Sequence, residues 1–296
     1  MRSPARGDPP VRVSVITATW NTRELILALV DSLHRHPPPC PWEMIVVDNG
    51  STDGSAGALA EKWPRAVVVR NTANRGFAAA NNQGYAASQG EMILLAGSDV
   101  EVREGALGAM VAYLDRHREA GAVACRLLNT DGTVQRSVRR LPRFRDALLT
   151  YCSLHRLARR YNMAGFDHTR TQEVEQPAAT FVLLRRSVVD QTGLFDERYA
   201  ILYNDVDLCR RIRAAGWKIV YVAEAAVTHR GCQTTRRAPL AVRLEMYRNI
   251  LLYFRESAGR WAALCLMPVL LVRLLAVTRD LRAFRLLDGR GGKRPT

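Results

Sequence analysis

The first hundred residues alternate between short apolar runs and helix-like segments, and this alternation constrains the fold more than any other feature of the chain. Apolar runs of strand length occupy residues 11–17, 44–47, 66–70 and 91–95. The segments between them carry apolar residues at helical spacing, as in Leu25, Leu29 and Leu33. Strands that alternate with helices in this way pair in parallel, with helices on both faces of the sheet. The sequence therefore predicts an α/β fold with a Rossmann-like, mainly parallel sheet.

A polar loop follows each of these predicted strands. The loops cover residues 18–22, 48–55, 71–76 and 96–100. In open α/β sheets, ligands bind in the crevice beyond the carboxyl ends of the strands. We therefore expect the four loops to line one pocket.

The second half of the chain is less regular. The turn-forming residues 129–132 predict a hairpin between runs at 123–128 and 134–137. Further on, the pattern predicts a strand, a helix and another strand at 180–184, 205–215 and 217–222. Residues 139–172 are basic and give no clear secondary structure. With no internal repeat and no long linker, we expect one catalytic domain over residues 1–237, in two halves at about 11–100 and 101–237, followed by a C-terminal extension over residues 238–296.

The formal net charge of +15 is confined to two segments. Residues 135–160 carry a net charge of +7 and residues 230–296 a net charge of +10, whereas the rest of the chain is nearly neutral. Only three of the 43 basic residues are Lys, and Arg pairs bidentately with phosphate, although a GC-rich genome would give the same bias. Because the basic segments lack interleaved aromatic residues or a known nucleic-acid module, we expect no nucleic-acid partner.

The extension favours contact with a membrane surface. Residues 240–256 are amphipathic, and residues 261–272 form an uncharged run that is shorter than the roughly 20 apolar residues of a spanning helix. Flanking Arg residues are typical of an interfacial helix on anionic lipid. The alternative is a helix that packs on the protein's own core or on a second subunit, and a homodimer stays open. No secretory signal precedes the first strand, and the six Cys residues form no C-x-x-C, so we expect a cytoplasmic protein that is peripheral on the inner face of the cell membrane.

Five polar residues can carry chemistry at the expected pocket. Asp48 can accept the imide N–H of uracil or thymine, and Arg75, at a helix start, can reach a diphosphate or the base. Asp99 can hold a hard divalent cation, with His229 as an imidazole ligand. Asp205 can act as a general base. The ordinary alternatives are a turn, a surface arginine, a helix cap, a structural histidine and an acid that stabilises a helix dipole.

Six segments in a fixed order resemble the family 2 inverting glycosyltransferases of GT-A fold, in particular their bacterial rhamnosyltransferase-like branch. The segments are VSVITATWN, IVVDNGSTDGS, NTANRGFAAANNQG, ILLAGSDVEV, GLFDERYAILYNDVDLCRRIRAAGWKIVYV and AAVTHRGCQTT. Each one is weak by itself, but together they follow the family's order and spacing, and the similarity covers roughly residues 11–235.

The resemblance implies a nucleotide-sugar half at about 11–100, an acceptor half at about 101–237, and a role for each matching residue. The nucleotide of a sugar donor would contact Thr17, Thr19, Asn21, Asp48, Arg75 and Ser98. Asp99 matches the last acid of the family's metal-binding D-x-D, and His229 matches a later metal or diphosphate contact. Asp205 matches the catalytic base. Acceptor contacts or supporting roles would fall to Asn204, Asp207 and Asp196.

Two positions depart from the family pattern. Gly97 stands at the first position of the D-x-D, so metal coordination would depend on Asp99, water and phosphate. Asn204 replaces the Glu that precedes the base, and the loss of a like charge should make Asp205 easier to ionise.

The expected activity is a metal-dependent, inverting sugar transfer from a nucleotide sugar, with Mg²⁺ or Mn²⁺ on the donor diphosphate. By resemblance, dTDP-rhamnose is the leading donor, and the acceptor is a glycan linked to a polyprenyl diphosphate or another cell-envelope glycan, as in polysaccharide biosynthesis. Alternatives are a UDP-hexose or galactofuranose transferase, or a catalytically weak scaffold with the same fold.

Overall fold

The computed structural model describes residues 9–152, 154, 161, 163, 165–199, 202–231 and 239–288, without the side chains of residues 241 and 276–288. The strands are β1 (Val13–Thr19), β2 (Trp42–Asp48), β3 (Val67–Arg70), β4 (Met92–Ala96), β5 (Val100–Val102), β6 (Ala120–Leu128), β7 (Val138–Arg139), β8 (Gln172–Val174), β9 (Gln176–Pro177), β10 (Phe181–Arg185) and β11 (Lys218–His229). The helices are α1 (Arg23–Arg35), α2 (Ser55–Lys62), α3 (Phe77–Ala87), α4 (Ala106–Arg116), α5 (Phe144–Tyr151), α6 (Arg186–Thr192), α7 (Asn204–Ala214), α8 (Pro239–Ser257) and α9 (Arg260–Asp288).

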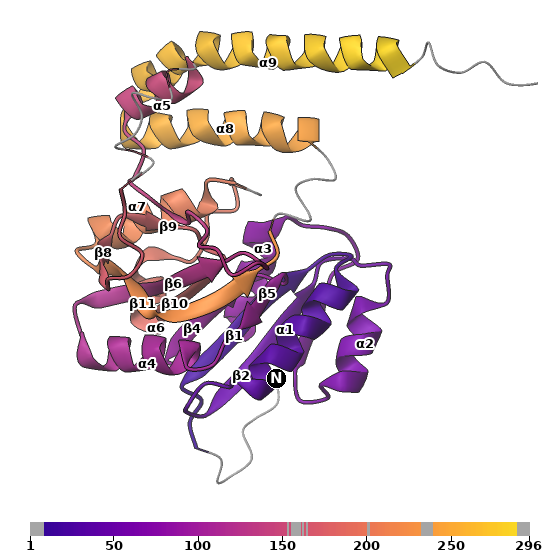
Figure 1. The fold of residues 1–296 in the computed structure, drawn as a ribbon, viewed down its shortest axis with the longest axis vertical. Helices are drawn as coiled ribbons and strands as arrows, with labels where there is room; N and C mark the ends of the chain where they lie inside the picture. The colour runs from indigo at the N-terminus through magenta and orange to yellow at the C-terminus, as the bar shows by residue number, and fades with distance from the viewer. Residues whose placement is uncertain are drawn as a thin grey trace, which may run out of the picture.

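One mixed, mainly parallel sheet organises the described part of the chain (Figure 1). Its strand order is β3-β2-β1-β4-β10-β6-β11-β5, and β8 pairs with β11 outside that path. β3, β2, β1 and β4 are parallel, which confirms the prediction from the βα alternation. β10 runs antiparallel between β4 and β6, and β6 pairs in parallel with β11.

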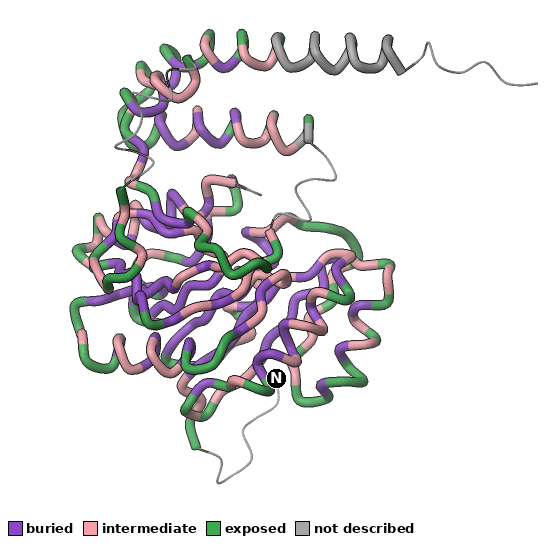
Figure 2. Tube along the Cα trace, in the orientation of Figure 1, coloured by how far each residue is buried: buried purple, intermediate pink, exposed green. Residues whose placement is uncertain are grey.

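Helices cover both faces of this sheet, as predicted. Along β4, Met92 and Leu94 pack into one core with α1, α2 and α4, whereas Ile93 and Leu95 pack into the other with α3, α6 and α7. This alternation follows from the two-residue period of side chains along a strand. Both cores are continuous across the sheet, and the buried strands lie at the centre of the molecule (Figure 2).

Several short elements were not predicted from the sequence. At the predicted hairpin, the structure has a turn with an isolated bridge between Leu128 and Val134, and residues 135–137 form no strand. β7 begins after them and pairs with β9. β5 directly follows the turn at 97–99 and pairs with the end of β11. Strands of two or three residues have too little sequence pattern to be recognised, since their pairing depends on distant partners.

The extension forms a third layer above the sheet domain (Figure 1). α5, α8 and α9 share an apolar cluster that includes Ile250, Tyr253, Phe254 and Leu266. This cluster continues onto Val206 of α7 and other residues of the sheet domain. The alternative that part of the extension packs on the protein's own core is therefore realised.

α9 is longer than the predicted apolar run, with 29 residues and Pro268 inside it. Within the described residues, no helix combines the length and the hydropathy needed to cross a membrane. Five of the six Cys residues are free thiols, and Cys232 lies outside the described residues.

Candidate functional site

Parallel pairing brings the first two polar loops together. β1 and β2 pair in register to their ends, where Thr19 is opposite Asp48. Asp48 is buried, and its Oδ1 accepts the backbone N–H of Ser51 at 3.0 Å. Asn21 has a positive φ of 52°, and its Oδ1 accepts the backbone N–H of Thr52 at 2.8 Å. The predicted residues Thr19, Asn21 and Asp48 therefore lie at one edge of the sheet.

Asn49 orders the third loop, a role that we did not predict from the sequence. Its Nδ2 donates to Asn74 Oδ1 at 2.9 Å and to the carbonyl oxygen of Gly76 at 3.2 Å. Its Oδ1 accepts the backbone N–H of Arg75 at 2.9 Å. The backbone of Arg75 is thus fixed beside the end of β2, while its side chain is exposed.

Hydroxyl groups at the end of β1 and just after it are connected by hydrogen bonds to the turn after β4. Thr19 and Thr22 share a hydrogen bond of 2.8 Å, and Thr22 donates to Ser98 Oγ at 3.3 Å. Thr17 is fully buried, and its Oγ1 has no hydrogen-bond partner among the described residues. Because a buried hydroxyl without a partner is costly, Thr17 is a candidate for contact with a bound molecule.

Asp99 and His229 meet although 130 residues separate them in sequence. Their elements are paired, since His229 at the end of β11 is opposite Val100 of β5. His229 Nε2 lies 3.4 Å from Asp99 Oδ2, and both side chains keep some exposure, 13% and 17%. On the other side of the ring, Nδ1 lies 2.7 Å from Gln135 Oε1. The pair offers one nitrogen and one oxygen ligand, and the described residues contain no group of three or more such side chains.

Gly97 is sterically tied to this pair. A Cβ at position 97 would lie 3.1 Å from Asp99 Oδ1 and 3.4 Å from the carbonyl oxygen of Thr180. A larger residue would therefore require the Asp99 carboxylate to shift. The departure from the D-x-D pattern fits the local packing of this chain.

Asp205 lies at the start of α7 and is contacted by the segment around β9. Its Oδ1 accepts the backbone N–H of Val206 at 2.8 Å, and its Oδ2 accepts from Gln176 Nε2 at 3.2 Å. Burial raises the pKa of the Asp205 carboxyl, against the opposing effects of the Val206 N–H, Arg139 and the Ala179 N–H. Burial thus acts in the opposite direction to the easier ionisation that we expected from Asn204.

A short segment connects this carboxyl to the Asp99 turn. The backbone N–H of Ala179 hydrogen-bonds the Asp205 carboxyl. The next residue, Thr180, accepts the backbone N–H of Gly97 at 2.8 Å. Asp205 and the turn that carries Asp99 are therefore neighbours in space.

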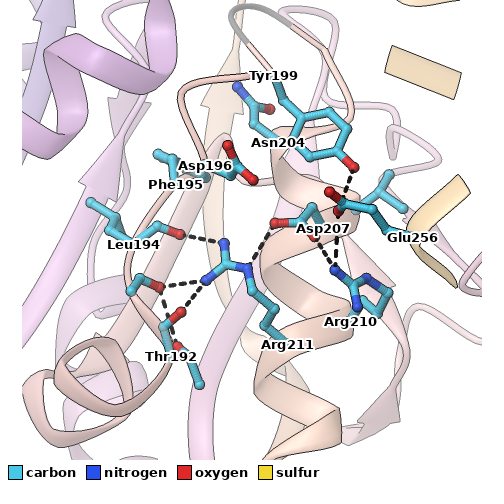
Figure 3. A network of polar contacts seen from close by, with 12 residues as sticks. Thr192, Leu194, Phe195, Asp196, Tyr199, Asn204, Asp207, Arg210, Arg211 and Glu256 are labelled. Atoms are coloured by element: carbon cyan, nitrogen blue, oxygen red, sulfur yellow. Dashed lines mark hydrogen bonds and ion pairs between the residues drawn. The ribbon is translucent and has the colours of Figure 1, made fainter. Parts of the chain in front are cut away.

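Asp207 lies in different surroundings from Asp205 (Figure 3). It is almost fully buried, and it accepts from Arg210 Nη2 at 2.6 Å and from Arg211 Nε at 2.7 Å. Arg211 also donates to the carbonyl oxygens of residues 192–194. Asp207 thus orients Arg211, which links α7 to the end of α6.

Asp196 and Asn204 also have structural contacts. Asp196 pairs with Arg198, which reaches Glu256 of α8 at 2.7 Å. Asn204 is buried, and its Oδ1 accepts the backbone N–H of Asp205 at 2.9 Å. The structure therefore gathers the predicted donor, metal and base residues at one edge of the sheet, and places Asp196 and Asp207 in an ion-pair network toward α8.

Comparison with known proteins is consistent with this arrangement. The family model described as "Glycosyl transferase family 2" matches residues 14–193. An N-acetylglucosaminyl-diphospho-decaprenol L-rhamnosyltransferase of Mycobacterium tuberculosis is 28% identical over 281 residues, which covers 84% of this chain and 90% of that protein. The O-antigen biosynthesis protein RfbC of Myxococcus xanthus is 32% identical over 77% of this chain, but only 18% of that protein is covered.

Solved structures share the fold at low sequence identity. The mannosyltransferase PcManGT from Pyrobaculum calidifontis, in complex with GDP-Man and Mn²⁺, aligns with a TM-score of 0.57 and 20% identity over 96% of this chain and 82% of that chain. S. aureus TarS 1–349 in complex with UDP-GlcNAc aligns with a TM-score of 0.57 and 18% identity over 83% of this chain and 67% of that chain.

Proposed function

Because this chain belongs to glycosyl transferase family 2, we propose that it transfers a sugar from a nucleotide diphosphate donor to a hydroxyl of a lipid-linked glycan, with inversion at the anomeric carbon. The observation that carries the proposal is the position of the Asp205 carboxyl beside the turn that bears Asp99. The similarity to a decaprenol-linked L-rhamnosyltransferase supports dTDP-rhamnose as donor, a polyprenyl-diphosphate-linked glycan as acceptor, and a role in cell-envelope polysaccharide biosynthesis.

The donor nucleotide would lie against the ends of β1 and β2. The Asp48 carboxylate would accept the imide N–H of thymine or uracil, which distinguishes these bases from cytosine. The Thr17 hydroxyl, for which the described residues provide no hydrogen-bond partner, is available for a hydrogen bond to the nucleotide. Arg75, whose backbone Asn49 fixes, would place its guanidinium near the diphosphate.

The ligand set at Asp99 and His229 fits a divalent cation. An imidazole nitrogen and a carboxylate oxygen 3.4 Å apart can contact one ion, and the remaining positions would fall to diphosphate oxygens and water. When bound, Mg²⁺ or Mn²⁺ would neutralise the charge that develops on the leaving diphosphate.

Asp205 would act as the general base. Its carboxylate takes the proton of the acceptor hydroxyl while that oxygen forms a bond to the anomeric carbon. The bond from that carbon to the diphosphate oxygen breaks on the opposite side, and the nucleoside diphosphate leaves. A carboxyl with a raised pKa is a stronger base than an exposed aspartate, so burial of Asp205 favours this proton transfer.

The extension would hold the enzyme on anionic lipid. α9 buries Leu266 and Leu270 in the apolar cluster that it shares with α5 and α8, whereas its Trp261 and Val272 are 74% and 65% exposed. An exposed apolar helix face with flanking Arg residues fits the interface of an anionic membrane. We propose residues 1–237 as the catalytic domain, residues 238–296 as this anchor, and a peripheral position on the cytoplasmic face of the membrane.

The catalytic proposal is tested by assaying transfer and donor hydrolysis with dTDP-rhamnose and with UDP-sugars, with and without Mn²⁺. Asp205→Asn should abolish transfer but keep the thermal shift caused by donor, since ligand that binds the native state raises its melting temperature. Asp31→Asn, in an exposed ion pair with Lys62, is the matched control and should keep full activity. An active Asp205→Asn enzyme would exclude this residue as the base.

The membrane proposal is tested by flotation with phosphatidylglycerol liposomes. Trp261→Glu combined with Val272→Glu should abolish binding, while Val67→Glu, at an exposed apolar position on β3, should leave it unchanged. Point variants are preferable to deletion of the extension, because α8 covers apolar residues of the catalytic domain. Unchanged flotation of the double variant would refute a lipid-facing α9.

A further inference from the structure

We propose that Gln135 is a positioning residue that holds His229 as its Nδ1–H tautomer and so turns the Nε2 lone pair toward Asp99. This inference deepens the proposed function, because it concerns how the chain prepares the proposed cation site. Gln135 has no part in the family resemblance described above, and its role follows from the direction of its hydrogen bonds.

The amide of Gln135 can face His229 in only one orientation. Its Nε2 lies 2.8 Å from the carbonyl oxygen of His229 and 2.8 Å from Asn129 Oδ1. A carbonyl oxygen only accepts hydrogen bonds, so the NH₂ group must face it. The amide oxygen Oε1 is then the atom 2.7 Å from His229 Nδ1, and that nitrogen must carry the proton.

A chain of hydrogen bonds fixes Asn129 in the same sense. The Thr133 hydroxyl and backbone N–H both donate to Asp131 Oδ1, at 2.6 and 2.9 Å. These two hydrogen bonds lower the pKa of the Asp131 carboxyl, which is therefore ionised and acts only as an acceptor. The Thr133 hydroxyl has spent its single proton, so it accepts from Asn129 Nδ2 at 2.8 Å. Asn129 consequently presents its oxygen to Gln135.

The backbone holds this chain against the end of β6. Gln135 N–H donates to the carbonyl oxygen of Leu127 at 2.8 Å, and Asn129 N–H donates to that of Thr133 at 2.8 Å. The turn that was predicted as part of a hairpin thus places Gln135 beside β11, where His229 ends the strand.

The tautomer decides whether the Asp99–His229 pair is open to a cation. With the proton on Nδ1, a neutral ring presents a lone pair at Nε2, 3.4 Å from Asp99 Oδ2. The His229 nitrogen and the Asp99 oxygen are then both acceptors, so they can bind a cation or a hydrogen-bond donor but not each other. With the proton on Nε2, the ring could donate to Asp99, and both ligands would be occupied by each other. A hydrogen bond to the second ring nitrogen is a common way to orient a metal-ligating histidine, and its loss typically weakens metal affinity 10–100-fold.

The test uses Gln135→Leu, which keeps the side-chain size and removes the amide. Gln89→Leu is the control, since Gln89 is exposed and, within the part of the chain that the structure describes, its hydrogen bond is made by its backbone N–H, to Glu43 Oε1 at 2.7 Å. Long-range ¹H–¹⁵N spectra of histidine-labelled, metal-free enzyme at about pH 9, where an imidazole of ordinary pKa is neutral, report the tautomer directly. His229→Gln assigns the signal.

We expect Nδ1–H in the wild type and in Gln89→Leu, and Nε2–H in Gln135→Leu. Mn²⁺ binding in the presence of dTDP, measured by electron paramagnetic resonance, should weaken about 10–100-fold in Gln135→Leu only. A wild-type ring with its proton on Nε2, or a Gln135→Leu enzyme with unchanged tautomer and Mn²⁺ affinity, would overturn the inference. A wild type with Nδ1–H that binds no Mn²⁺ would support the tautomer assignment and refute the cation in the proposed function.

Discussion

The two acids at the start of α7 differ in their contacts, and Asp207→Asn tests the difference. Asp207 is 1% exposed and receives hydrogen bonds from two arginines at 2.6 and 2.7 Å. Asn is nearly isosteric, but it removes the negative charge and presents an NH₂ group to a guanidinium donor. Arg211, which also caps the carbonyl oxygens at the end of α6, would lose its counterion.

The expected loss of stability follows from the burial of the three side chains. Removal of one partner of a fully buried ion pair costs about 3–5 kcal/mol. The side chains of Arg210 and Arg211 keep 29% and 21% exposure, so water can solvate part of the charge that is left behind. We therefore expect a loss of about 2–3 kcal/mol, which at about 2–4 °C per kcal/mol for a large domain lowers the melting temperature by about 4–12 °C.

The assay combines thermal and urea denaturation with transfer activity at a temperature where the variant is folded. Asp31→Asn, whose ion pair with Lys62 is about 40% exposed on both sides, should lose less than about 1 kcal/mol. Asp207→Asn should keep most of its activity when folded. Unchanged stability of Asp207→Asn would refute the structural role. A loss of activity without a loss of stability would instead favour a contact between Asp207 and the acceptor.

Three further predictions concern the proposed base, the proposed cation site and the third layer. Because burial raises the pKa of Asp205, the decline of kcat/KM on acidification should begin at a higher pH than it would for an exposed aspartate. The raised pKa also means that this carboxyl stabilises the fold fully below its unfolded-state pKa and loses that effect as pH rises through its folded-state pKa. Asp205→Asn should therefore melt no lower than wild type at pH 8, and a lower melting temperature there would contradict the linkage argument. Gly97→Ala should weaken Mn²⁺ binding without unfolding the enzyme, since its Cβ would press on Asp99 Oδ1, and titration with Mn²⁺ decides this. Phe254→Ala should lower the free energy of unfolding, measured by urea denaturation, by about 3–5 kcal/mol. Phe254 of α8 is 1% exposed, packs against Phe144 of α5, and belongs to the cluster that continues onto the sheet domain. A loss below about 1 kcal/mol would show that the third layer is only loosely attached.

The sequence by itself determined the parallel half of the sheet and the edge at which the candidate site lies. Short apolar runs separated by helices with a 3.6-residue period allow few arrangements, and the loops at 18–22, 48–55, 71–76 and 96–100 must then meet at one edge. Asp48 and Asp99 were accordingly identified as candidates without knowledge of any contact, whereas Asp205 was identified from its place at a helix start and from the family resemblance.

Only the tertiary structure decided what surrounds each of these residues. No local pattern pairs β5 with the end of β11, yet this pairing brings His229 to Asp99. The turn that carries Gln135 is local in sequence, but the role of Gln135 depends on His229, which is 94 residues away in sequence. The different surroundings of Asp205 and Asp207 likewise come from tertiary contacts. Two arginines contact the Asp207 carboxylate, whereas Gln176 contacts that of Asp205. The sequence does not reveal this difference, because burial, charge and hydrogen-bond direction depend on neighbours in space.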